Sequence, residues 1–222
     1  MKPTFSTIIT LFFFLFTFST KTPQAAAATP EPVLDISGEK LKAGESYFVL
    51  PAGRGRGGGL TFGTFGDSCP RVVVQERFET SKGEPVQFLP ANPKNHVIFT
   101  SRNLNVQFSR RTTSACDESR VWKLTKFISE AMNVGINGIA GNQDFSTISN
   151  WFMIEKAEFE GVYKLKFCPK EGVVTCEDLG VFSANGDGKR YVGLANPGQF
   201  QQLRVVFQKA QANEEGDIAM ST

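Results

Sequence analysis

The chain has 222 residues, with 24 Lys and Arg against 22 Asp and Glu, one His and four Cys. A composition of 41% hydrophobic and 21% charged residues is typical of one or two globular domains and excludes a disordered chain. Residues 1–30 hold two lysines and no acid, so 22 basic and 22 acidic residues remain in the body. This neutral body argues against nucleic acid or an anionic membrane as the main partner, because both attract a strongly basic surface.

The N-terminus has the pattern of a secretory signal peptide. Lys2 precedes the apolar run Ile8–Phe18, which is shorter than the roughly 20 residues that a membrane-spanning helix needs. The small residues Ala25–Ala28 follow and offer cleavage sites. We therefore expect residues 1–28 to be removed and the mature chain, without a membrane segment, to be secreted. The expected destination is the apoplast or cell wall, with the vacuole as the alternative.

Export into an oxidising compartment predicts disulfide bonds for the four cysteines, Cys69, Cys116, Cys168 and Cys176. Four cysteines allow three pairings, and sequence alone does not decide between them. Locality favours Cys168 with Cys176 across a short turn, which leaves Cys69 with Cys116. No CxxC pair occurs and His96 is the only imidazole, so we expect neither a metal site nor a cofactor.

Residues 29–210 form a pattern of many short strands without a long linker, which indicates one domain, and the polar tail 211–222 is expected to fray. Strand-like runs are separated by clusters of Gly, Pro, Asn and Asp. This spacing predicts an all-β barrel or sandwich. The expected strands are Ser46–Leu50, Arg71–Gln75, Val97–Thr100, Leu104–Phe108, Trp151–Glu155, Val162–Phe167, Tyr191–Leu194 and Leu203–Gln208.

One segment departs from this pattern. Val121–Met132 places its apolar residues three and four positions apart, a spacing that by itself predicts a helix.

Two motifs that would indicate an enzyme fail on their context. Gly53–Gly58 matches GxGxxG, but the strand-like Leu60–Phe65 follows where a dinucleotide site requires a helix. His96 lies in a Pro- and Asn-containing loop without a nucleophile motif, so a Ser–His–Asp hydrolase gains no support. We therefore expect that the protein is not an enzyme.

Ten short motifs run through the body of the chain: Val33–Leu41, Tyr47–Val49, Arg56–Leu60, Cys69-Pro70, Val73–Gln75, Leu104–Val106, Trp151-Phe152, Tyr163–Pro169, Asp178–Gly180 and Val206-Phe207. Together they resemble the plant Kunitz-type (soybean trypsin inhibitor) family. Asn92-Pro93-Lys94 after Pro90, with Leu104–Phe108, is similar to the miraculin-like branch in particular. The resemblance implies a β-trefoil, with twelve strands in three pseudo-repeats, six of them in a barrel and six capping it. It also implies two disulfides with the cysteine spacings seen here, and strand and loop rather than helix at residues 121–132.

The resemblance places a protease-binding reactive loop at Phe88–Val97. Family inhibitors insert such a loop, in extended form, into the cleft of a serine endopeptidase. Counting back from Leu104–Phe108 puts Lys94 at the residue that enters the specificity pocket, with Asn95 after the scissile bond and His96 beyond it. Counting forward from Cys69 puts Pro93 there instead, and we prefer Lys94.

One residue behind this loop departs from the family pattern. Ala43 stands where family inhibitors carry an Asn that supports the loop through hydrogen bonds. Two alternatives therefore stay open beside a monomeric serine-protease inhibitor. One is an inhibitor of cysteine endopeptidases that uses other loops, and the other is a non-inhibitory defence, storage or ligand-binding protein.

Overall fold

The computed structural model describes residues 29–65, 68–109, 116, 119–128, 131–169, 176–184, 186–194 and 200–211. The expected signal peptide, 1–28, and tail residues 212–222 lie outside this set. Among the described residues, six strands form a closed antiparallel barrel. In order around it the strands are β13 (Arg204–Lys209), β1 (Ser46–Pro51), β4 (Val86–Pro90), β5 (Leu104–Phe108), β8 (Phe152–Lys156) and β9 (Tyr163–Phe167). The pairing of β9 with β13 completes the barrel.

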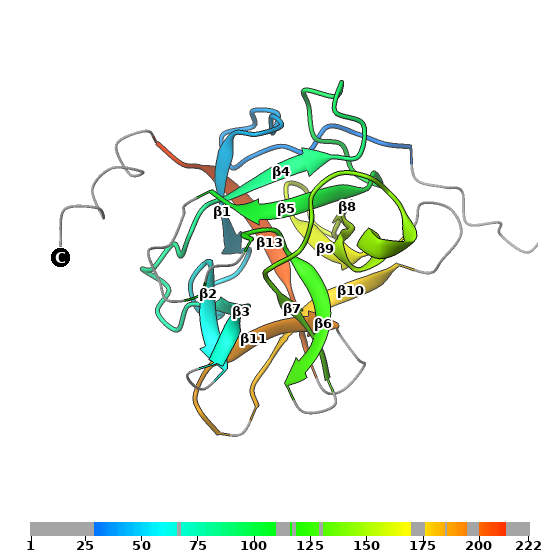
Figure 1. Cartoon of the computed structure of the whole chain (residues 1–222). Coiled ribbons are helices and arrows are strands. Elements are labelled where there is room, and N and C mark those ends of the chain that lie inside the picture. The colour runs from blue at the N-terminus through cyan, green and yellow to red at the C-terminus, as the bar shows by residue number, and fades with distance from the viewer. Residues whose placement is uncertain are drawn as a thin grey trace, which may run out of the picture.

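Three hairpins cap one end of this barrel. They are joined to one another by the pairs β3–β11, β3–β7 and β7–β11. Figure 1 shows them below the barrel, on the side away from the loop that joins β4 to β5. The hairpin strands are β2 (Leu60–Phe65) with β3 (Ser68–Gln75), β6 (Lys123–Ile128) with β7 (Ala131–Gly135), and β10 (Glu177–Phe182) with β11 (Arg190–Leu194); the short β12 (Gln201–Gln202) pairs with β10, and the 3₁₀-helix η1 is Phe145–Asn150.

Aromatic and branched side chains alternate along the barrel strands and fill the interior, as the period of two for half-buried strands requires. Phe88 on β4 and Phe207 on β13 meet edge to face, with ring centroids 5.3 Å apart. Trp122, which is fully buried, lies between Phe108 and Phe152, with centroid distances of 5.7 and 6.0 Å. One continuous core therefore fixes the strands that carry the loops.

The helix predicted from the spacing of Val121–Met132 is wrong, because this segment contributes β6 and β7. The pairing of the two strands shifts in register between Lys126 and Ile128. The apolar pattern runs across two strands and the residues between them, so its spacing does not describe a single element. The expectation of strand and loop that came from the family resemblance is confirmed.

The strand predicted at Val97–Thr100 is also wrong. Isolated bridges join Val97 to Lys42 and Phe99 to Pro32, without a continuous ladder. The amides of Val33 and Thr100 donate to the carbonyls of Ile98 and Glu31 on either side of the Pro32 bridge, so this segment is held by single bridges to the N-terminal segment and not by a strand.

Two disulfides join Cys69 to Cys116 and Cys168 to Cys176, with Cα–Cα distances of 5.9 and 4.5 Å. The long one ties β3 to the chain that precedes β6, and the short one joins the end of β9 to the start of β10. This is the pairing that locality favoured. The described residues contain no cluster of His, Cys, Asp or Glu that could hold a metal ion, and none of their helices is long and apolar enough to cross a bilayer.

Candidate functional site: the loop between β4 and β5

The four residues expected to contact an endopeptidase all lie in the loop between β4 and β5, which projects at the top of Figure 1. Pro93, Lys94 and His96 are exposed, and Asn95 is partly buried. At the base of the loop the Ala91 amide donates to the Asn103 carbonyl at 2.9 Å, which continues the β4–β5 pairing by one step.

The tip of the loop is a tight turn. The Asn95 amide donates to the Asn92 carbonyl at 3.0 Å, which makes Pro93 and Lys94 the two central residues of a β-turn. The Lys94 amide donates to the Asn92 side-chain oxygen at 3.1 Å. The turn presents the Lys94 side chain to solvent, and no carboxylate of the described residues forms an ion pair with it. The extended form expected for this loop is therefore not the form at its tip.

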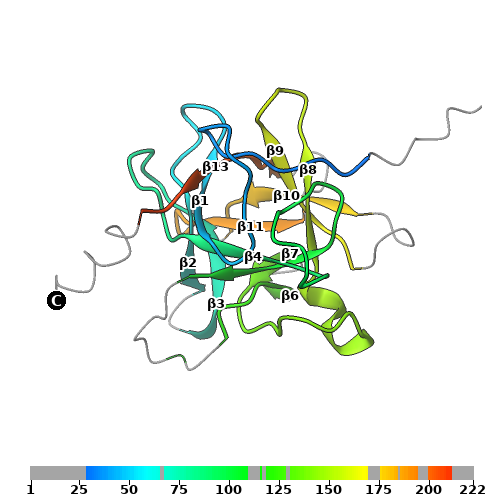
Figure 2. The same cartoon turned by 90° about the horizontal axis from the view of Figure 1, so that it is seen from above.

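The second arm of the loop is held by the N-terminal segment, which Figure 2 shows in blue crossing this end of the barrel. Ile98 lies between two buried residues of that segment: its amide donates to the Leu41 carbonyl, and its carbonyl accepts from the Val33 amide, both at 2.9 Å. The Tyr163 hydroxyl of β9 accepts from the Leu34 amide at 2.9 Å and anchors the segment to the barrel. The chain after His96 is therefore fixed on both sides.

A turn at Ala43 supports the loop from behind. The Ala43 amide donates to the His96 carbonyl at 3.0 Å, and the next amide, that of Gly44, donates to the Phe88 carbonyl at 3.2 Å. Position 43 thus contacts the loop as the family resemblance implied, but it does so through its backbone. An Ala side chain adds no hydrogen bond.

Tyr47 holds this supporting turn in place. Its buried hydroxyl accepts from the Lys42 amide at 2.9 Å and donates to the Glu45 carboxylate at 3.1 Å. Burial raises the pKa of Tyr47 to about 12, and the neighbouring Lys209 ammonium, 2.7 Å from Glu45, lowers the pKa of that carboxyl. The hydroxyl therefore stays protonated at neutral pH and keeps both hydrogen bonds.

The connection between β7 and β8 lies beside the loop and displays apolar side chains. Phe145 is 89% exposed and Ile139 62% exposed. The Asp144 carboxylate caps η1 by accepting from the amides of Ser146 and Thr147, so Phe145 lies on ordered backbone. A hollow of about 400 Å³ separates this connection from the loop and is lined by Pro90, Ala91, Asn92, Asn95, Arg102, Asn103 and Gln143.

Residues 33–209 match the legume Kunitz family, described as "Trypsin and protease inhibitor". The chain belongs to this Kunitz family. It is 40% identical to miraculin from Synsepalum dulcificum, over 82% of this chain and 87% of miraculin. It is 36% identical to Kunitz trypsin inhibitor 5 of Arabidopsis thaliana, over 92% and 99% of the two chains.

Solved Kunitz structures share the fold. A Kunitz-type trypsin inhibitor from Cicer arietinum is 34% identical, with a TM-score of 0.67, and the match covers 82% of this chain and 99% of that one. Soybean trypsin inhibitor is 26% identical, with the same TM-score, over 81% and 100%. The β-trefoil that the resemblance implied is confirmed: among the described residues six strands form the barrel and six form the three cap hairpins, with the short β12 added beside β10. The Arabidopsis, Cicer and soybean relatives are inhibitors rather than enzymes.

Two functional features of this Kunitz site were missed by sequence reasoning. Asn-Pro at 92–93 is a common start of a turn and could have predicted the bend at Lys94. The hydrogen bonds of Tyr47 to Lys42 and Glu45 have no local sequence signal. They form only when β1 is folded into the barrel.

Proposed function

We propose that the protein inhibits a serine endopeptidase of trypsin-like specificity, with Lys94 entering the specificity pocket and Asn95 following the scissile bond. The observation that carries this proposal is an exposed lysine at the tip of a loop whose two arms are both fixed, in a chain of the Kunitz inhibitor family. A loop held in this way loses little conformational entropy when it binds, which is the source of affinity in substrate-like inhibitors. The site of action is proposed to be extracellular, after removal of residues 1–28.

Two features weaken the expected inhibition. The turn hydrogen bond between Asn95 and Asn92 must open before residues on both sides of Lys94 can lie extended in a protease cleft, at a cost of about 0.5–1.5 kcal/mol. The support from position 43 is limited to one backbone hydrogen bond. We therefore propose a slower and weaker inhibitor than one whose loop is extended in the free state.

Apolar side chains beside the loop can add to the contact with the protease. Phe145 projects from the connection that shares the hollow next to Asn92 and Asn95. Aromatic side chains that become buried at the centre of an interface contribute much of its affinity. We propose that Phe145 packs against the rim of the protease cleft when Lys94 is bound.

The test is inhibition of trypsin, chymotrypsin and papain by the mature, disulfide-bonded protein. Trypsin should be inhibited, and Lys94→Ala should raise the inhibition constant by about 30-fold or more, since a buried charge pair is lost. Lys126→Ala is the matched control, because Lys126 is exposed on β6, away from the loop. Equal inhibition constants for the wild type and Lys94→Ala would contradict the assignment of the loop.

The second candidate is a non-inhibitory protein of the same fold. The turn at Lys94 and the alanine at position 43 both favour it, because each removes a feature on which a rigid, extended reactive loop depends. Rapid cleavage at Lys94–Asn95 by trypsin, without inhibition, would identify the loop as an ordinary substrate and support this candidate.

A further inference from the structure

A pocket of about 460 Å³ lies at the far end of β1 from the reactive loop. β1 begins at Ser46, next to the turn that supports the loop, and ends at Pro51 on the wall of the pocket. Six strand residues at about 3.3 Å each separate the two places by roughly 17 Å. The volume is within the range of about 300–1,000 Å³ that is typical of sites for small organic molecules. The pocket is thus outside the surface proposed to meet a protease.

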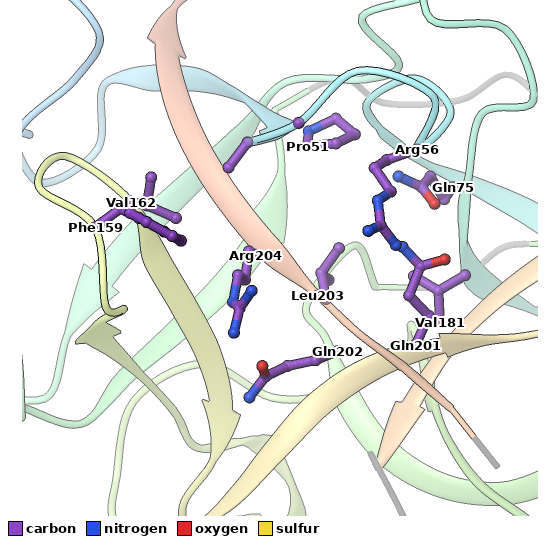
Figure 3. Close-up of a pocket in the computed structure, with 12 residues that line it drawn as sticks. Pro51, Arg56, Gln75, Phe159, Val162, Val181, Gln201, Gln202, Leu203 and Arg204 are labelled. Carbon is purple, nitrogen blue, oxygen red and sulfur yellow. The ribbon is translucent and has the colours of Figure 1, made fainter. Parts of the chain in front are cut away.

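One wall of the pocket carries hydrogen-bond donors. Figure 3 shows Arg56 reaching down from the loop after β1 toward Gln201, with Gln75 beside it. No carboxylate of the described residues forms an ion pair with the Arg56 guanidinium. The Gln201 side-chain oxygen accepts from Arg190 at 3.5 Å, which leaves its amide nitrogen to donate. A guanidinium and an amide N–H₂ on one wall are complementary to the oxygens of an anion.

This wall is held in place from behind by Arg190 and Gln75. The Arg190 guanidinium donates to the Gln75 side-chain oxygen at 2.9 Å and to the Arg56 carbonyl at 3.2 Å. Gln75 is buried, and its amide nitrogen donates to the Gly58 carbonyl at 3.1 Å. Arg190 therefore holds the backbone at Arg56 and the side-chain oxygen of Gln201, so this wall is largely preformed, as is usual for binding pockets.

The opposite wall combines the apolar side chains of Phe159 and Val162 with Arg204 and Gln202, whose amide nitrogen donates to Asp178 at 2.8 Å. Figure 3 shows Phe159, Val162 and Arg204 on this side, with Leu203 between the two walls. Phe159 is 65% exposed at the rim, where its ring is open to a ligand. Arg204 forms an ion pair with Glu158 at 3.1 Å. None of the described residues that line the pocket is an Asp or Glu.

We infer that this pocket binds a small aromatic molecule that carries an anionic oxygen group, such as an aromatic carboxylate. The anionic group meets Arg56 and the Gln201 amide, and the flat apolar body lies over Leu203 and Val162 against the ring of Phe159. A guanidinium pairs with the oxygens of carboxylates, sulfonates and phosphates alike. The structure therefore specifies a negative charge and an aromatic ring in the ligand, and the experiment decides which anionic group it carries.

The experiment is titration of the mature, disulfide-bonded protein with 2-naphthoate, followed by calorimetry and by NMR. 2-Naphthalenesulfonate and 2-naphthyl phosphate test the other head groups, and neutral 2-naphthamide is the uncharged control. At least one of the anions should bind saturably at one site, about tenfold or more tightly than the amide, and the anion that binds most tightly identifies the head group.

Two variants locate the site. Arg56→Gln should weaken binding of the anion about tenfold or more and leave the amide unchanged. Arg54→Gln is the matched control, because Arg54 is exposed in the same loop but does not line this pocket, and it should have little effect. Phe159→Ser should weaken binding of all the compounds, through the loss of ring contact. Absence of saturable binding, equal affinity for the amide and the anions, or equal effects of Arg56→Gln and Arg54→Gln would overturn the inference.

Discussion

Replacing Tyr47 by Phe removes a single oxygen atom that holds the turn behind the reactive loop. The aromatic ring keeps its place against Phe88, but the Lys42 amide loses its acceptor and the Glu45 carboxylate loses a donor. Leaving a partly buried amide without a partner costs about 1–3 kcal/mol. For a chain of this size that corresponds to a melting temperature lower by roughly 2–12 °C.

Urea denaturation measures the loss of stability, and hydrogen exchange shows where it occurs. The Ala43 amide, which is bonded to the His96 carbonyl, should exchange about 5- to 150-fold faster in Tyr47→Phe, as expected for local opening that is easier by 1–3 kcal/mol. Tyr191→Phe is the control, because that hydroxyl donates to Asp187 in the cap. Unchanged exchange at Ala43, or equal changes in both variants, would refute a supporting role for Tyr47.

The Tyr47 hydroxyl should also make the free energy of unfolding depend on pH in the alkaline range. The pKa of Tyr47 rises from 10.0 to about 12 on folding, so the folded state holds its proton more tightly than the unfolded state does. This contribution to stability is complete below pH 10 and is lost as the pH rises toward 12. The free energy of unfolding of Tyr47→Phe should therefore fall less steeply over that interval than that of the wild type.

Three further predictions concern the loop, its neighbour and the disulfides. Ala43→Asn should lower the inhibition constant for trypsin about 2- to 10-fold by adding one hydrogen bond to the loop, whereas Ala43→Leu, which adds bulk without a donor, should not. Phe145→Ser should raise that constant about tenfold, while Phe78→Ser, which removes a ring of similar exposure (67%) elsewhere, should leave it unchanged; equal effects would argue against contact at Phe145. Removal of the long disulfide, which spans 47 residues, should lower the free energy of unfolding by about 1.6 kcal/mol more than removal of the short one, which spans 8, as measured in urea.

The barrel strands were largely predictable because their side chains alternate. Leu104–Phe108 is a strand with the predicted bounds, and the predicted Ser46–Leu50 lies within β1. β4 and β10 were not predicted. β4 ends in Pro90, and β10 begins with two acidic residues before its buried half, so neither has a full alternating run.

The position of the candidate site followed from the family resemblance, but its conformation did not. Residues 93–96 lie in an exposed loop, as expected, and position 43 contacts that loop. The turn at Lys94 is held by the hydrogen bonds of Asn92, and the Asn-Pro pair at 92–93 was its only local signal, whereas the family resemblance implied an extended loop. The pocket at Arg56 was beyond sequence reasoning, because its walls come from residues about 150 positions apart that only the closed barrel brings together.

The pairing of the first barrel strand with the last has a consequence for the order in which the chain can fold. β1 is made early in synthesis, but its partner β13 is complete only at residue 209. Until that strand has emerged, β1 and β9 each have an unpaired edge where β13 belongs, and contacts between such distant segments form slowly. β13 is therefore the strand that closes the barrel. A chain truncated before residue 204 would leave two edges open at once, with the aromatic core between them accessible to water and to other chains.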